Sequence, residues 1–224
     1  VMIDSYVNKA FKIHYFNMSE NESMPQLSGE QLMNRDAIAR YVIGMLMLDA
    51  QYTPFEIIGN EYHFSSAFSV PKENGESLVV RFEGDIDRVD KKGETIRVLD
   101  YKSGGKAKNM KTIDSLFIPS KDRYSYALQV MMYSYFYSLE KNVQVKPAIA
   151  YLKTAKSLDA LDIMLDKEVL TSANAYFAEL KQGMERTIGE LFDKEIPFVA
   201  NKDCPSCEYC DYLSICGVKP KKNW

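Results

Sequence analysis

Two aspartates and a lysine near the middle of the chain have the composition of a hydrolytic metal site. Asp100 and Lys102 are separated by one residue, and Asp87 lies a short distance upstream. Alternate residues of a β-strand share a face, so Asp100 and Lys102 are expected on the same side of one strand. Neighbouring carboxylates repel each other unless a cation lies between them, and their hard oxygen atoms suit Mg²⁺ or Mn²⁺.

Such a site has the chemistry of phosphodiester hydrolysis. A bound divalent ion contacts a phosphate oxygen, lowers the pKa of its water and stabilises the leaving oxygen. A nearby ammonium, here that of Lys102, orients the water or offsets developing negative charge. The alternative is a structural ion pair among Asp87, Asp100 and Lys102, since a bare Asp-x-Lys is common in proteins.

A predicted β-hairpin positions these residues. The runs 77–90 and 94–103 are strand-like, and they are joined by two lysines and Gly93, which can adopt the positive φ of a hairpin turn. A four-residue loop over 91–94 makes the numbers of opposed residues add to an odd value. This parity places Asp87 on the same face as Asp100 and Lys102.

The remaining elements predict an α/β fold with a central mixed sheet flanked by helices. Ser28 and Gln31 form a capping-box pattern that predicts a helix over about 29–51. Apolar spacing predicts helices over 124–141 and 172–193, the second with a stripe of buried residues at Phe177, Leu180, Met184, Ile188 and Leu191. Strands are expected over 55–68, 147–153 and about 161–165.

Length and composition describe one ordinary globular domain. The chain has 224 residues, of which 46% are hydrophobic and 26% charged. The run 41–48 is too short to cross a bilayer and no signal peptide precedes it, so we expect a cytoplasmic protein without membrane contact. The first residue is Val1, which suggests a piece of a longer protein.

The charge distribution bears on nucleic-acid binding. A net charge of −3 disfavours a protein that coats nucleic acid nonspecifically. Lys106, Lys108 and Lys111 belong to a locally basic stretch that is a weak candidate for phosphate contacts, and a solvated loop is the alternative.

All four cysteines lie in a C-terminal tail over 201–224, which follows a predicted domain over 1–200. They are Cys204, Cys207, Cys210 and Cys216. Four thiolates suit either an iron–sulfur cluster or tetrahedral Zn²⁺, and a cytoplasmic setting disfavours disulfides. Free, buried cysteines are the alternative.

Three ordered motifs resemble the RecB-like branch of the PD-(D/E)XK nucleases. They are GDIDRVD over 84–90, VLDYKSG over 98–104 and QVMMY over 129–133. The resemblance implies a restriction-endonuclease-like core in which Asp87 and Asp100 bind the divalent metal and Lys102 is the catalytic lysine. It also implies a glutamate as a third metal ligand, for which Glu61 is the best match, ahead of Glu56.

The third motif supplies Gln129 and Tyr133, which the resemblance implies line the active site and the DNA strand. At i and i+4 they share one helical face, although a plain helix surface is the alternative. The segment 207–217 looks like the end of AddB-like nucleases, which carry a [4Fe-4S] cluster. There the fourth cysteine usually lies far upstream, whereas this chain has Cys204. Neither histidine, His14 nor His63, has the surroundings of the histidine often found in this branch.

The resemblance implies a Mg²⁺- or Mn²⁺-dependent deoxyribonuclease, an exonuclease that acts on single-stranded DNA ends in repair and recombination beside a helicase domain or subunit. One alternative is a catalytically retired nuclease fold that binds DNA or braces a partner. Another is a zinc-ribbon interaction module whose function resides in the cysteine tail.

Overall fold

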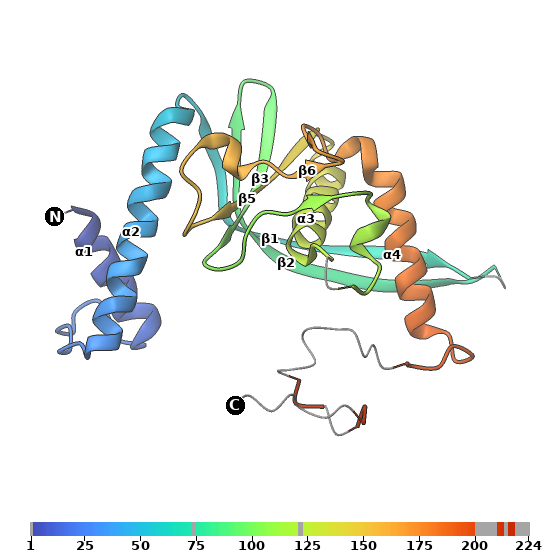
Figure 1. The fold of residues 1–224 in the computed structure, drawn as a ribbon, viewed down its shortest axis with the longest axis horizontal. Helices are drawn as coiled ribbons and strands as arrows, with labels where there is room; N and C mark the ends of the chain where they lie inside the picture. The colour runs from blue at the N-terminus through green and yellow to red at the C-terminus, as the bar shows by residue number, and fades with distance from the viewer. Residues whose placement is uncertain (1, 73–74, 121–122, 200–209, 213–214, 218–224) are drawn as a thin grey trace. The chain divides into compact units, whose positions relative to one another are not determined.

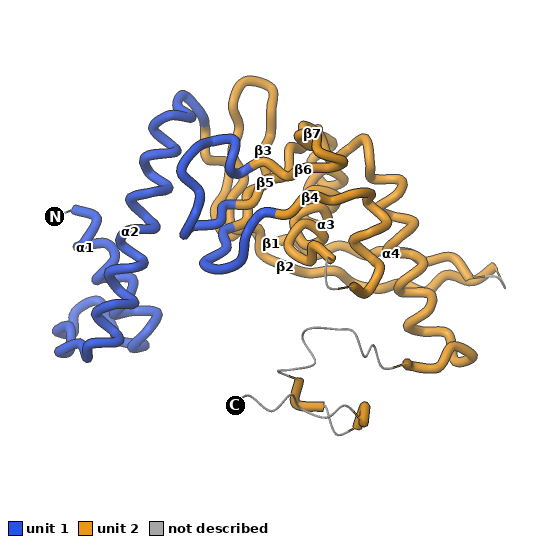
Figure 2. Tube along the Cα trace, in the orientation of Figure 1, with its two compact units in different colours: residues 1–55, 101–107, 150–161 blue, residues 56–100, 108–149, 162–224 orange. Residues whose placement is uncertain are grey.

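The computed structural model is a mixed α/β fold, in agreement with the sequence prediction (Figure 1). It describes residues 2–72, 75–120, 123–199, 210–212 and 215–217. The chain forms two compact units (Figure 2). The first consists of residues 1–55, 101–107 and 150–161, and the second of residues 56–100, 108–149 and 162–224.

A four-stranded sheet forms the centre of the fold. Its order is β1-β2-β3-β5, with β1 at Glu56–Pro71, β2 at Ser77–Lys92, β3 at Thr95–Lys102 and β5 at Val145–Tyr151. β1 and β2 form a long antiparallel ribbon that runs toward α4 (Figure 1). A smaller sheet has the order β4-β6-β7, with β4 at Asn109–Met110, β6 at Met164–Leu165 and β7 at Glu168–Val169.

The predicted hairpin is formed by β2 and β3, with a shorter turn than expected. Pairing continues to Lys92 opposite Thr95, so only Gly93 and Glu94 form the turn. Gly93 has a φ of 59°, the left-handed conformation that two-residue hairpin turns require. The predicted loop over 91–94 was therefore too long, but the numbers of paired residues do add to an odd value, as predicted.

Aromatic side chains pack α3 (Ser125–Lys141) onto the β1–β2 ribbon. The ring of Phe136 stacks on Phe64 at a centroid distance of 5.3 Å and lies 5.0 Å from Phe82. Tyr133 meets Phe64 edge to face at 5.7 Å. These contacts explain why the helix is rich in aromatic residues, because offset and edge-to-face ring pairs contribute packing energy beyond their buried area.

α4 is shorter at both ends than the predicted helix over 172–193. It spans Phe177–Phe192 and follows a short 3-10 helix at Asn174–Tyr176. The Asn174 side chain accepts a hydrogen bond from the Val145 backbone N–H at 2.8 Å and donates one to Ser138 Oγ at 2.9 Å, which holds this segment outside α4.

The predicted buried stripe of α4 was right at its centre and wrong at its end. Leu180, Met184 and Ile188 are buried, and Phe177 is half-buried. Leu191 remains 54% exposed, because the helix ends one residue later and no packed element covers that turn among the described residues of the unit.

The first unit contains α1 (Met2–Ala10), a π-helix at Phe11–Tyr15 and α2 (Gly29–Tyr52). The predicted capping box is present, with Ser28 and Gln31 bonded reciprocally at the start of α2. Arg35 of α2 donates to Asn8 Oδ1 at 2.8 Å and pairs with Asp4 at 3.1 Å, which ties α2 to α1. None of the helices in the described ranges is both long and apolar enough to span a membrane.

Gly183 of α4 gives a prediction about packing. A Cβ at this position would lie 2.2 Å from Cε2 of Phe117, a distance that real contacts do not reach. We expect Gly183→Ala to lower the free energy of unfolding by about 1–3 kcal/mol through overpacking. Thermal unfolding should then show a melting temperature lower by roughly 2–4 °C per kcal/mol.

Gly189→Ala on the same helix is the matched control, because nothing lies within 4 Å of the position that a Cβ would take there. Replacing an accessible helical glycine by alanine should stabilise the protein by up to about 1 kcal/mol. Equal melting temperatures for the two variants would contradict the packing assigned to Gly183 and Phe117.

Candidate active site

The hairpin places Asp87 and Asp100 at facing positions of β2 and β3. The last paired residues are Arg88 and Leu99, and continuing this antiparallel register by one residue sets Asp87 opposite Asp100. Side chains at such positions have Cβ atoms about 4.5–5.5 Å apart. Asp100 is 1% exposed, and Asp87 is half-buried.

Glu61 occupies the corresponding position of β1. The β1–β2 register pairs Asn60 with Arg88 and Tyr62 with Ile86, so Glu61 lies between these pairs, across from Asp87. Its φ of 48° is left-handed, which is rare for a residue other than glycine. This local irregularity lies at the strand position that faces the predicted metal ligand, and strained backbone of this kind is frequent at functional sites.

Tyr62 holds this part of β1 against the end of α3. Its hydroxyl donates to Glu140 Oε1 at 2.8 Å, and its ring meets Tyr137 edge to face at 5.2 Å. The hydrogen bonds that Glu140 accepts from Lys141 and from Tyr62 lower the pKa of this carboxyl group. The anchoring residue is therefore the direct neighbour of the left-handed Glu61.

The three carboxylates suit a divalent cation in chemistry and in strand position. Glu61, Asp87 and Asp100 supply hard oxygen donors from neighbouring positions on three adjacent strands. Yet in the part of the chain that the structure describes, no three Asp, Glu, His or Cys side chains form a group that could hold a metal ion. The backbone aligns the predicted ligands, whereas their side chains are not gathered around one point.

Lys102 is the last residue of β3, two positions beyond Asp100. Strand alternation gives the two residues the same face. The Lys102 carbonyl accepts a hydrogen bond from the Leu152 backbone N–H at 2.9 Å, which anchors the end of the strand. Its side chain is half-buried.

Gln129 and Tyr133 lie on one face of α3, as predicted. Gln129 Nε2 donates a hydrogen bond to the Tyr133 hydroxyl at 2.9 Å. The two residues line a cavity of about 240 Å³ whose wall also includes the apolar side chains of Phe64, Phe82 and Leu128.

Gly84 is a residue of this region whose role the sequence analysis did not identify. A Cβ at Gly84 would lie 3.1 Å from Cε1 of Phe64 and 3.1 Å from Cε1 of Tyr133. The first motif therefore contains a glycine at a position where the Tyr133 ring closely approaches β2. The place of Gly84 at the start of the first motif was the only hint of its role in the sequence. The ring that approaches it belongs to α3, which is distant in the sequence.

The residues around Asp87 include a second set that the sequence analysis did not assign. Arg88, Asp90 and Arg97 are charged and nevertheless buried within the sheet. Arg88 and Asp90 belong to the charged motif GDIDRVD, and Arg97 directly precedes the second motif, but charged residues in a strand fit an exposed strand equally well.

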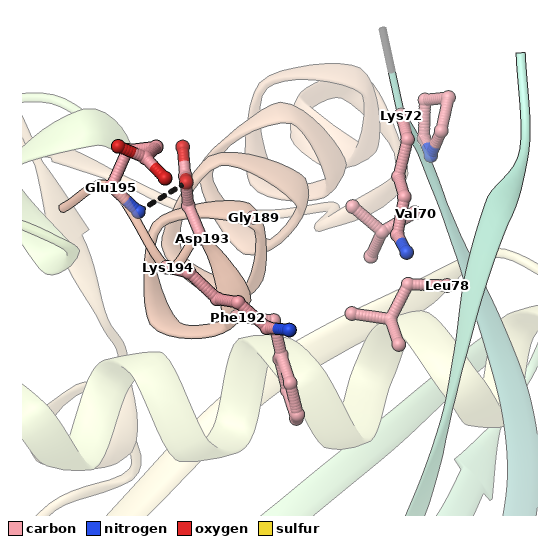
Figure 3. Close-up of a pocket in the computed structure, with 9 residues that line it drawn as sticks. Val70, Lys72, Leu78, Gly189, Phe192, Asp193, Lys194 and Glu195 are labelled. Atoms are coloured by element: carbon pink, nitrogen blue, oxygen red, sulfur yellow. Dashed lines mark hydrogen bonds between the residues drawn. The ribbon is translucent and has the colours of Figure 1, made fainter. Parts of the chain in front are cut away.

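A separate cavity of about 510 Å³ lies between the end of α4 and the β1–β2 ribbon (Figure 3). Its lining includes Val70, Leu78 and Phe192, and the turn after α4 is closed by a hydrogen bond from the Glu195 backbone N–H to Asp193 Oδ1 at 2.9 Å. Among the described residues that line it, none belongs to the predicted site.

The structure describes all the predicted basic residues but only two of the four predicted cysteines. Lys106, Lys108 and Lys111 are exposed, as phosphate contacts require. Cys204 and Cys207 lie outside the described residues. Cys210 is half-buried and Cys216 exposed, and both are free thiols.

A family model for the PD-(D/E)XK nuclease superfamily matches residues 6–217. The match spans the β1–β2–β3 region and α3, and therefore all the residues predicted for the active site. A comparison with curated proteins returned no match.

The close approach at Gly84 can be tested by substitution. We expect Gly84→Ala to lower the free energy of unfolding by about 1 kcal/mol, because Phe64 or Tyr133 must move by a few tenths of an ångström. Chemical denaturation measures the change.

Phe64→Leu removes one of the two crowding ring atoms and provides the control. If the crowding is real, the double variant should be more stable than the sum of the single effects predicts. Strict additivity would indicate that Gly84 is not constrained by these rings.

Proposed function

Because the chain belongs to the PD-(D/E)XK nuclease superfamily, we propose that it is a divalent-metal-dependent deoxyribonuclease that hydrolyses DNA phosphodiester bonds. The observation that carries this proposal is the register that sets Asp87 opposite Asp100, with Lys102 two residues further on the same strand. Members of this superfamily typically use divalent metals.

In the proposed site Asp87, Asp100 and Glu61 hold Mg²⁺ or Mn²⁺. The bound ion would polarise the scissile phosphate and lower the pKa of its water. Asp100 is almost completely buried, and a carboxylate in such surroundings is stabilised by a cation beside it. Lys102 supplies an ammonium that orients the water or offsets charge as the phosphate is attacked.

The finer functional assignment rests on the resemblance of the motifs to the RecB-like branch. It comprises exonuclease action on single-stranded ends, a role in DNA repair and recombination, and a helicase domain or subunit as partner. Gln129 and Tyr133 would contact the DNA strand from α3.

Lys106, Lys108 and Lys111 are proposed to contact the phosphate backbone, since all three are exposed. Phosphate contacts make binding depend on salt, so reversing the charge of Lys106 and Lys108 should reduce the salt dependence of DNA binding.

The second candidate function is a retired nuclease fold that binds DNA or braces a partner without cutting. The observation that favours it is that, within the described ranges, Glu61, Asp87 and Asp100 do not form a three-ligand group. The two candidates differ in one measurable property, which is metal-dependent cleavage.

Digestion of end-labelled single- and double-stranded DNA tests the nuclease, with Mg²⁺, with Mn²⁺ and with chelator. We expect cleavage only with metal, and a fall of at least about 100-fold in Asp87→Asn, Asp100→Asn and Lys102→Ala, because even outer-sphere changes at metal sites cost 10–100-fold. The two Asn variants preserve side-chain shape, so circular dichroism should remain that of the parent protein.

Asp85→Asn is the matched control. Asp85 lies two residues before Asp87 on β2, is exposed, and pairs with His63 at 2.9 Å. Its substitution should leave cleavage within about twofold of the parent rate. Full activity in folded Asp100→Asn would overturn the site, whereas DNA binding without cleavage by the parent protein would favour the retired fold.

We propose further that Cys207, Cys210 and Cys216, with Cys204 as fourth ligand, hold a [4Fe-4S] cluster, with Zn²⁺ as the alternative metal. Protein purified without oxygen should be brown and contain about four iron atoms per chain, because thiolate-bound clusters absorb visible light. Colourless protein with one zinc would select the zinc site, and protein with neither metal would contradict metal binding by the tail.

A further inference from the structure

Arg88, Asp90 and Arg97 form a buried ion cluster in the β2–β3 hairpin. They are 3%, 0% and 5% exposed. Arg97 donates from Nε to Asp90 Oδ1 at 3.0 Å and from Nη2 to Asp90 Oδ2 at 2.7 Å, a two-point contact of its planar guanidinium. Arg88 Nε lies 2.9 Å from Asp90 Oδ2, as an ion pair without hydrogen-bond geometry.

The ion cluster connects the two strands that carry Asp87 and Asp100. Asp90 is paired directly with Arg97, and Arg88 is paired with Leu99, one position before Asp87 and Asp100 face each other. A slip of one residue between the strands would move the Arg97 side chain to the other face of the sheet. The two-point contact with Asp90 therefore forms in the observed register and is lost in the neighbouring ones.

The apolar residues of this region discriminate poorly between registers. Ile86 and Leu99 belong to one face of the hairpin, Val89 and Val98 to the other, and all four are 0% exposed. Where only one face is buried, a slip of one residue exposes the apolar set to water. Here both faces are buried, so a slipped strand would still bury Val98 and Leu99.

Buried charged side chains can distinguish the observed strand register from the neighbouring ones, which the apolar residues do not. A buried ion cluster contributes little net stability compared with apolar residues of similar size, because removing the charges from water is costly. Its best-attested use is to specify one arrangement among several, since every alternative leaves a charge buried without its partner.

We propose that Arg88, Asp90 and Arg97 are positioning residues that fix the β2–β3 register and thereby hold Asp87 opposite Asp100. They act through the backbone and touch neither metal nor DNA. The consequence for metal binding rests on the proposed nuclease function, whereas the consequence for strand register does not.

An apolar replacement of the whole cluster tests the proposal in the full chain. In the triple variant Arg88→Met, Asp90→Leu and Arg97→Met, circular dichroism should stay close to that of the parent. Nuclear Overhauser contacts between the backbone protons of Val89 and Val98, which report the register, should weaken or be replaced by contacts one residue away. Calorimetric titration should show Mn²⁺ affinity at least tenfold lower.

Arg97→Lys is a milder variant that keeps the charge and removes the two-point contact. It should leave the melting temperature nearly unchanged and speed hydrogen exchange of the amides between Arg88 and Leu99 at least tenfold. Arg81→Lys is the matched control, because Arg81 lies on the same strand, has a 73% exposed side chain and pairs with Glu83 only at 3.7 Å. Exchange of these amides should be unaffected there.

Parent-like Overhauser contacts and Mn²⁺ affinity in the triple variant would overturn the proposal. Should the triple variant not fold, Arg97→Lys decides, and unchanged amide exchange overturns the proposal. If the parent protein shows the Val89–Val98 contacts but binds no Mn²⁺, the proposed metal site fails, and the Overhauser contacts of the variants alone decide the positioning role.

Discussion

The antiparallel register of β2 and β3 is the constraint on which the candidate site depends. The turn at Gly93 and Glu94 determines which residues face each other, and the pairing continues unbroken to Arg88 and Leu99. A second register adds Glu61, because β1 pairs with β2 over most of its length. The two-residue turn thus determines that Asp87 and Asp100 face each other, and the β1–β2 pairing sets Glu61 across from Asp87. An error of one residue at the turn would move Asp100 away from its position opposite Asp87.

The packing of α3 against β1 and β2 is a second constraint on the sheet. Rings of Tyr133 and Phe136 pack on β1 and β2, and Gly84 provides the space for this close contact. The same helix carries the hydrogen-bonded pair Gln129 and Tyr133. A motif that reads as a set of functional residues therefore also contains the packing contacts that determine the distance between helix and sheet.

Elements with a local signal were predictable from the sequence. The capping box at Ser28, the glycine of the β2–β3 turn and the apolar spacing of α4 each depend on residues only a few positions apart. Where the prediction was wrong or incomplete, distant residues decided the outcome. Asn174 bonds to Val145 and to Ser138, so the segment before α4 is not part of that helix.

The candidate site shows the same division between local and distant causes. Strand alternation places Asp100 and Lys102 on one face, and the parity of the hairpin turn adds Asp87. The left-handed backbone of Glu61, the approach of Tyr133 to Gly84 and the burial of Asp90 between two arginines all depend on tertiary packing, and single-sequence patterns do not contain this information.

The composition of the two units has a consequence for the order of folding. The first unit is assembled from residues 1–55, 101–107 and 150–161, so it lacks part of its contacts until the chain has been synthesised beyond residue 161. Contacts between such distant segments form slowly, because long loops must close first. During synthesis, α1 and α2 must therefore leave the ribosome well before the last segment of their own unit, and in that interval the unit lacks the contacts that this segment provides.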